Sequence, residues 1–184
     1  NKIRDLNASG NKGLNKVYWG LDQNPPKVAV GGFTAGSTVL FSSVIGPRAP
    51  IGTYKAVLQI GDAKYEQAVQ LVENPRKGFS AQTIQSIYNQ SMRLFKLHEQ
   101  LYQLVDSMDK QIAVLKKNEQ RTEIESNKLK QLDSLRAEII ETNRKTVFFD
   151  EFKYRRKLSD VYVAICIALE PFSPSKIGAI EVLE

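Results

Sequence analysis

The spacing of apolar residues changes at Asn74-Pro75 and divides the chain into two parts. Before this dipeptide, apolar and polar residues alternate in short runs between turns, as at Tyr54, Ala56 and Leu58. After it, apolar residues recur three and four positions apart over a long stretch. A period of two predicts half-buried strands, and a period of 3.6 predicts amphipathic helices. The pattern therefore predicts an α+β chain, with a β domain over residues 1–74 and a helical domain over residues 75–184.

The β domain is expected to contain at least four strands. The predicted strands span residues 15–21, 38–45, 53–60 and 64–72, with residues 2–6 as a further candidate. Gly61-Asp62-Ala63 connects the last two as a hairpin, because glycine readily adopts the positive φ that tight turns require. Short strands at this spacing favour an Ig-like, Greek-key antiparallel β-sandwich.

The helical domain opens with a long predicted helix from its N-cap at Ser80 to about Asn118. Its inward positions follow the alternating three-four spacing of a heptad pattern, which indicates packing against another helix. We call six of these positions the interaction seam: Leu94, His98, Leu101, Val105, Met108 and Ile112. The seam fits a neighbour within the chain and a second chain equally well.

Three further helices are expected after a turn at residues 116–122. They span about residues 124–140, residues 149–169, and a segment that starts at Ser173-Pro174 and ends with the chain after about three turns, as if truncated. Glu170-Pro171 stops the second of these, because the residue before a proline disfavours the helical conformation. The expected architecture is a three- to four-helix antiparallel bundle.

The sequence offers no recognisable catalytic constellation. His98 and Cys166 are the only histidine and cysteine, so neither a catalytic triad nor a set of nitrogen and sulfur metal ligands can be assembled from them. We expect His98 to be a hydrogen-bonded core residue and Cys166 to be a small buried apolar residue. No catalytic residue, metal site or cofactor is predicted, and the chain is not expected to be an enzyme.

The net charge of +6 invites a nucleic-acid interpretation, so the location of the charge matters. Residues 1–79 carry ten Lys/Arg against five Asp/Glu, whereas residues 80–184 carry sixteen against fifteen. The only dense basic cluster, residues 153–157, lies on a predicted helix, and no nucleic-acid-reading motif accompanies it. We interpret it as a solvated helix face and expect no nucleic-acid partner. No apolar run approaches the roughly 18 residues of a membrane span.

Several motifs occur in a familiar order. Gly13-Leu14-Asn15-Lys16-Val17-Tyr18-Trp19 is followed by Gly46-Pro47, by Pro50-Ile51-Gly52-Thr53-Tyr54, and by Asn74-Pro75-Arg76. This order resembles the C-terminal Ig-like module, similar to that of the flagellar hook-capping protein, and the following helical region of bacterial sortilin/VPS10-type or BNR-repeat "glycosyl hydrolase" β-propeller proteins. The likeness covers about residues 1–115 well. It departs at Gly20 and Asn74, where the family usually has aspartate.

This resemblance implies a non-catalytic structural or interaction module near the C-terminus of a larger extracytoplasmic bacterial protein. Any active site would lie in the upstream propeller, and the partner would be that propeller or another protein. The first residue, Asn1, fits either a processed leader or a piece of a longer chain. The alternative is a carbohydrate-binding accessory module, in which Tyr18 contacts a glycan, because sugar rings stack on aromatic faces, while Trp19 and Tyr54 belong to the core.

Overall fold

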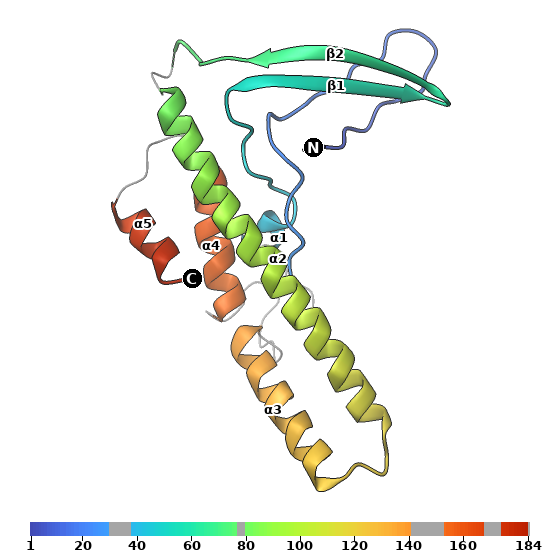
Figure 1. The fold of residues 1–184 in the computed structure, drawn as a ribbon, viewed down its shortest axis with the longest axis vertical. Coiled ribbons are helices and arrows are strands. Elements are labelled where there is room, and N and C mark those ends of the chain that lie inside the picture. Colours follow the sequence, from blue (N-terminus) through green and yellow to red (C-terminus); the bar gives the residue numbers. More distant parts are fainter. Residues whose placement is uncertain (30–37, 77–79, 141–152, 168–173, 184) are drawn as a thin grey trace.

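The computed structural model describes residues 1–29, 38–76, 80–140, 153–167 and 174–183. Within these ranges the chain is mostly helical, with a single two-stranded antiparallel sheet and five helices (Figure 1). The elements in chain order are α1 (Thr38–Ser42), β1 (Gly52–Ile60), β2 (Ala63–Leu71), α2 (Ala81–Lys117), α3 (Glu123–Ile139), α4 (Tyr154–Ile167) and α5 (Pro174–Glu181).

The predicted Ig-like β-sandwich is wrong, because the described residues form one sheet layer of two strands. Of the predicted strands, only the last two exist. They form the expected hairpin, with Tyr54 opposite Val69 and Leu58 opposite Tyr65. Gly61 in the connection has a φ of +56°, which explains the requirement for glycine there.

Residues 15–21 form no strand. Leu21, the last residue of this segment, has a φ of 58°, which an extended strand does not contain. The Trp19 indole N–H donates to the carbonyl of Asp22, three residues on, so the end of the segment folds back locally. Residues 2–6 also form no strand.

Residues 38–42 form a helix where a strand was predicted. Short apolar runs do not distinguish a strand from a buried helical turn, so tertiary contacts decide between them. The hydroxyls of Ser42 and Ser43 donate to the carbonyls of Val39 and Leu40, three residues back. Ser42 also hydrogen-bonds Ser159 of α4, and α1 packs on that helix.

The four predicted helices of the C-terminal part are present as α2 to α5, and α1 raises the number of described helices to five. Ser80 caps α2 as expected, accepting a hydrogen bond from the backbone N–H of Thr83. A capping box of Thr122 and Glu125 begins α3. Of the helix predicted over residues 149–169, residues 149–152 and 168–169 lie outside the described residues.

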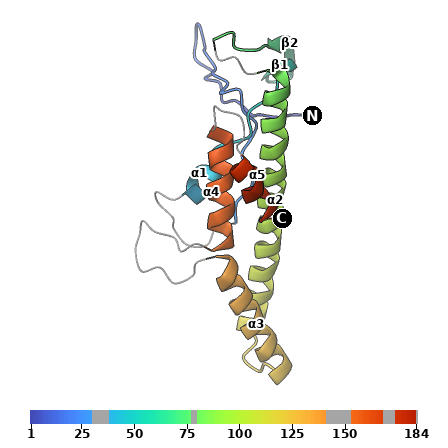
Figure 2. The same ribbon diagram turned by 90° about the vertical axis from the view of Figure 1, so that its left-hand side faces the viewer.

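The helices are arranged around α2, which runs almost the full length of the molecule. Figures 1 and 2 show α4 beside the first half of α2 and α3 beside its second half. Two ion pairs hold α3 on α2: Arg136 with Asp109, and Lys116 with Asp133. The main core lies between α2 and α4, and it also takes in Ala29, Ile140 and α5. None of the helices in the described ranges combines the length and apolar character that crossing a bilayer needs.

Candidate interaction surface

The β1–β2 hairpin has one apolar face and one polar face. The apolar side, which we call the hairpin face, consists of Tyr54, Ala56, Leu58 and Ile60 of β1 and Ala63, Tyr65, Gln67, Val69 and Leu71 of β2. At the tip of the hairpin, Leu58 is 47%, Ile60 62% and Tyr65 59% exposed. These are large apolar side chains at the spacing of a half-buried strand, yet about half of each remains exposed.

The opposite side of the hairpin is stabilised by charge. Lys55 and Lys64 both reach the Glu66 carboxylate, at 2.7 and 2.9 Å. Hydrogen bonds from these two lysines lower the pKa of Glu66 to about 2. The two sides therefore show the alternation that is typical of an antiparallel sheet whose apolar face is packed and whose polar face is in contact with solvent.

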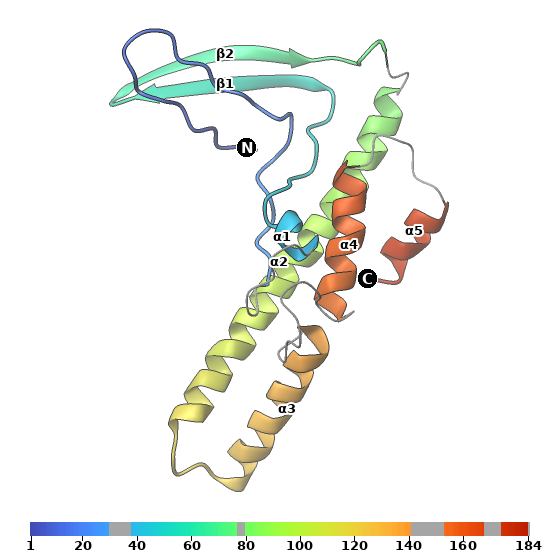
Figure 3. The same cartoon turned by 180° about the vertical axis from the view of Figure 1, so that it is seen from behind.

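Within the described residues, the end of the hairpin face that lies nearest the helices is in contact with another segment of the chain. There, Trp19 meets Tyr54 edge-on, with ring centroids 5.3 Å apart. Burial raises the pKa of the Tyr54 hydroxyl, which donates to the carbonyl of Pro50. Figure 3 shows the hairpin extending sideways from the end of α2, with its tip far from every helix. The covered end and the bare tip thus belong to the same continuous face.

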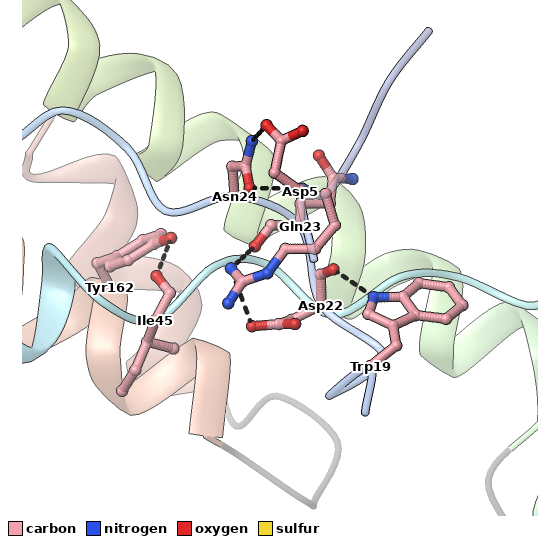
Figure 4. Close-up of polar contacts among 8 residues, drawn as sticks. Asp5, Trp19, Asp22, Gln23, Asn24, Ile45 and Tyr162 are labelled. Carbon is pink, nitrogen blue, oxygen red and sulfur yellow. Dashed lines mark hydrogen bonds and ion pairs between the residues drawn. The ribbon is translucent and has the colours of Figure 1, made fainter. Parts of the chain in front are cut away.

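Polar contacts join the N-terminal segment to residues 19–24, and the segment before β1 to α4 (Figure 4). The Arg4 guanidinium donates to the carbonyl of Gln23 at 2.7 Å and pairs with Asp22 at 3.4 Å. The Gln23 backbone N–H donates to the carbonyl of Pro47 at 2.8 Å. A Cβ on Gly46 would lie 1.9 Å from the Gln23 carbonyl oxygen, so the two segments approach more closely than any side chain would allow.

On the core side of this network, the Tyr162 hydroxyl of α4 donates to the carbonyl of Ile45 at 2.9 Å. The Gln23 side chain donates to the Tyr88 hydroxyl of α2 at 2.8 Å. Residues 21–24 and 45–48 thus form the connection between the sheet and the helices. This connection positions the hairpin relative to α2 and α4.

The structure places all six seam residues on the buried side of α2. Their exposed fractions are Leu94 0%, His98 0%, Leu101 6%, Val105 3%, Met108 3% and Ile112 7%. Leu94, Leu101 and Val105 belong to the core that α2 forms with α4. The chain itself therefore buries the seam, which leaves no apolar stripe there for a second chain.

His98 is buried as expected, but the hydrogen bonds expected for it are absent from the described structure. Neither ring nitrogen has a partner among these residues. Burial lowers the pKa of His98 to about 4, and its ring lies edge-on to Tyr162 at 5.1 Å. Cys166 is buried on the next turn of α4, and burial raises the pKa of its thiol to about 11.

Tyr18, the predicted glycan contact, is 83% exposed, whereas Trp19 is half-buried against Tyr54. The two neighbouring rings therefore do not form a joint platform.

The basic cluster at residues 153–157 differs from the solvated face expected for it. Arg155 is 1% exposed and donates to the carbonyl of Ala29 at 3.2 Å, and Arg156 pairs with Asp160 at 2.9 Å. Sequence reasoning missed this structural role, because only the helical spacing of Arg155 relative to Leu158 and Tyr162 signals it. Within the described ranges, no group of three His, Cys, Asp or Glu side chains is placed to hold a metal ion.

The whole chain was compared with known proteins in three ways. No protein-family model, no curated protein and no solved structure matches the chain.

Proposed function

We propose that this chain is a non-catalytic interaction module that docks onto another protein surface through the hairpin face. The observation that carries the proposal is the bare apolar tip formed by Leu58, Ile60 and Tyr65. An isolated two-stranded hairpin is marginally stable in water and normally needs a further layer on its apolar side. Exposed apolar patches with polar surroundings are typical of protein–protein contacts.

The partner is expected to present a flat, apolar surface with acidic residues at its rim. Flatness follows from the two-stranded sheet, whose side chains stand in rows on one plane. The acidic rim follows from charge, since residues 1–79 carry ten basic and five acidic side chains. Complementary charge around an apolar contact speeds encounter and fixes orientation.

The sequence motifs that resemble sortilin/VPS10-type and BNR-repeat proteins support a more specific form of this proposal. In that form, the chain is a C-terminal module of a larger extracytoplasmic bacterial protein, and its partner is the upstream propeller or another protein. The Ig-like sandwich expected from the same motifs is not part of the proposal, because the described residues form a single two-stranded layer.

Site-specific photo-crosslinking in cells that produce the native protein tests the docking face. A benzophenone side chain at position 65 lies on the hairpin face, and one at position 59 lies on the polar face of the same hairpin. Crosslinks from position 65 to an identifiable protein segment, with few or none from position 59, are the expected result. Equal crosslinking from both positions, or none from position 65, would refute docking through this face.

The size of the native polypeptide tests the more specific form. An antibody against the chain, applied to fractionated cells, is expected to detect a band several times larger than 20.7 kDa in an extracytoplasmic fraction. A band near 20.7 kDa would exclude the larger polypeptide, and the crosslink from position 65 would then identify a separate partner protein.

The alternative of carbohydrate binding rests on a single observation, the 83% exposure of the Tyr18 side chain. Glycan-array binding that is abolished in Tyr18→Ala, with an unchanged circular-dichroism spectrum, is the result that supports it. Unchanged glycan binding in this variant, or no binding by the wild-type chain, counts against it.

A further inference from the structure

The contact between α2 and α4 contains a buried imidazole without hydrogen-bond partners. His98 of α2 is fully buried, and both of its ring nitrogens lack a partner among the described residues. Tyr162 of α4 meets the ring edge-on, with centroids 5.1 Å apart. A neutral imidazole has one donor and one acceptor, and leaving them unpaired in an apolar core costs free energy. A protonated ring would be far worse accommodated, because it adds a second donor and a full charge.

The surroundings of His98 give the charged ring no compensation. Burial keeps Tyr162 and Cys166 neutral by raising the pKa of each, and the lowered pKa of His98 is caused by burial. The elements packed around this contact carry several charged residues: Arg93, Lys96 and Glu99 of α2, Arg155, Arg156, Lys157 and Asp160 of α4, Glu181 of α5, Asp22 and Lys27 of residues 22–29, and Arg48 of residues 45–49.

Most of these charged side chains already form hydrogen bonds or ion pairs with groups other than His98. The Arg48 Nε donates to the Cys166 carbonyl at 3.3 Å. Glu99 accepts a hydrogen bond from the backbone N–H of Lys27, and Asp160 accepts hydrogen bonds from Arg156 and Thr38. The Asp22 carboxylate pairs with Arg4 through Oδ2, while its Oδ1 is buried without a hydrogen-bond partner among the described residues. No ion pair joins any of these carboxylates to His98 in the described structure.

We propose that His98 is an acid-sensitive latch, so that proton uptake by its imidazole separates α4 from α2. The separation carries α1 and α5 with it, because both pack on α4. The α2–α3 hairpin stays intact, because Arg136–Asp109 and Lys116–Asp133 join these helices independently of His98. The latch is distinct from the hairpin face and does not depend on the proposed docking.

The direction of the effect follows from proton linkage. In the opened or unfolded chain, His98 has its ordinary pKa of 6.5, whereas burial lowers the pKa in the closed state to about 4. The closed state is therefore fully favoured above pH 6.5 and loses its advantage as the pH falls toward 4. This difference shifts the open-to-closed ratio by about two orders of magnitude across that interval.

Cys166 provides a built-in reporter, because it is the only cysteine and is 3% exposed in the same contact. The experiment measures the reaction of the full chain with 4,4′-dithiodipyridine from pH 7.5 to 4, for the wild type and for His98→Phe. Rates are divided by those of the same chain unfolded in urea at each pH, which removes the intrinsic pH dependence of the thiol. The expected result is a relative rate that rises up to about a hundredfold toward pH 4 in the wild type and stays nearly flat in His98→Phe.

A matched control separates the latch from general weakening of the contact. Tyr162→Phe retains the ring but removes the hydrogen bond to Ile45, so labelling should be faster at every pH while its acid dependence stays. The same acid dependence in the wild type and in His98→Phe would overturn the proposal, because the carboxylates would then account for it.

If His98→Phe does not fold, a nuclear magnetic resonance titration of the wild-type imidazole decides the question. Protonation of His98 that coincides with exposure of Cys166 supports the latch. Protonation near pH 6.5 while Cys166 remains protected overturns it.

Discussion

The β1–β2 hairpin and the first half of α2 are both amphipathic, but their apolar sides have different neighbours. On α2, Leu94 and Leu101 are buried by α4 and by segments from both halves of the chain. On the hairpin, Leu58 and Ile60 remain about half exposed, and Trp19 covers only the end near Tyr54. An amphipathic pattern thus predicts that a face needs a cover, but it does not say whether the cover belongs to the same chain.

The largest effect that tests this comparison is expected from shortening one leucine in each region. Leu94→Ala removes a fully buried side chain from the core and should lower the free energy of unfolding by about 2–5 kcal/mol. Leu58→Ala removes a side chain that is 47% exposed and should cost less than about 1 kcal/mol. Urea denaturation followed by circular dichroism measures both. Equal costs would show that the hairpin face is already covered in the isolated chain.

A smaller effect is expected at the connection between the two regions. In Gly46→Ala, the new Cβ meets the carbonyl oxygen of Gln23 at 1.9 Å, and this oxygen belongs to the backbone and cannot rotate away. The strain should lower the free energy of unfolding by about 1–3 kcal/mol. Gly10→Ala is the matched control, because nothing lies within 4 Å of its Cβ. A stability of Gly46→Ala within error of the control would contradict the tight connection.

The smallest effect is expected on the polar face of the hairpin. Lys55 and Lys64 lower the pKa of Glu66 to about 2, so their attraction is present above pH 4.5 and is lost as the pH falls toward 2. Because all three side chains are exposed, the solvent screens this attraction, and Glu66→Gln should change the stability at pH 7 only slightly. A titration of the Glu66 carboxyl by nuclear magnetic resonance checks the pKa, and urea denaturation at pH 7 and pH 3 checks the stability. A large loss in Glu66→Gln at pH 7 would mean that this face is packed rather than solvated.

The elements that the sequence predicted well are those with a strong local signal. The hairpin has the period of two and a glycine at its turn, and α2 has Ser80 as its N-cap and a heptad pattern whose buried positions run from Ile87 to Ile112. Sequence reasoning failed where the signal was a short apolar run, as at residues 38–42, or a single aromatic anchor, as at Trp19. At residues 38–42, the helix packs on α4 through the contact of Ser42 with Ser159. At Trp19, a local hydrogen bond to Asp22 is combined with the ring contact to the distant Tyr54.

The same limit applies to the candidate surface. The alternation that separates Tyr65 from Glu66 is visible in the sequence, so the apolar side of the hairpin could be predicted. Its exposure could not, because the strands expected to cover it at residues 15–21 and 38–45 do not exist. Nor could the pattern show that His98 would be buried without a hydrogen-bond partner.

The sequence by itself therefore determined which segments are strands or helices when period, caps and turn residues agree, and which side of each is apolar. These properties depend on hydrogen bonds and side-chain directions within a few residues. Only the tertiary structure decided that α3 and α4 cover α2, that the tip of the hairpin face stays about half exposed, and that Arg155 enters the core. Those outcomes depend on contacts between segments up to 126 residues apart, such as Arg155 with Ala29, whose free energies no local pattern encodes.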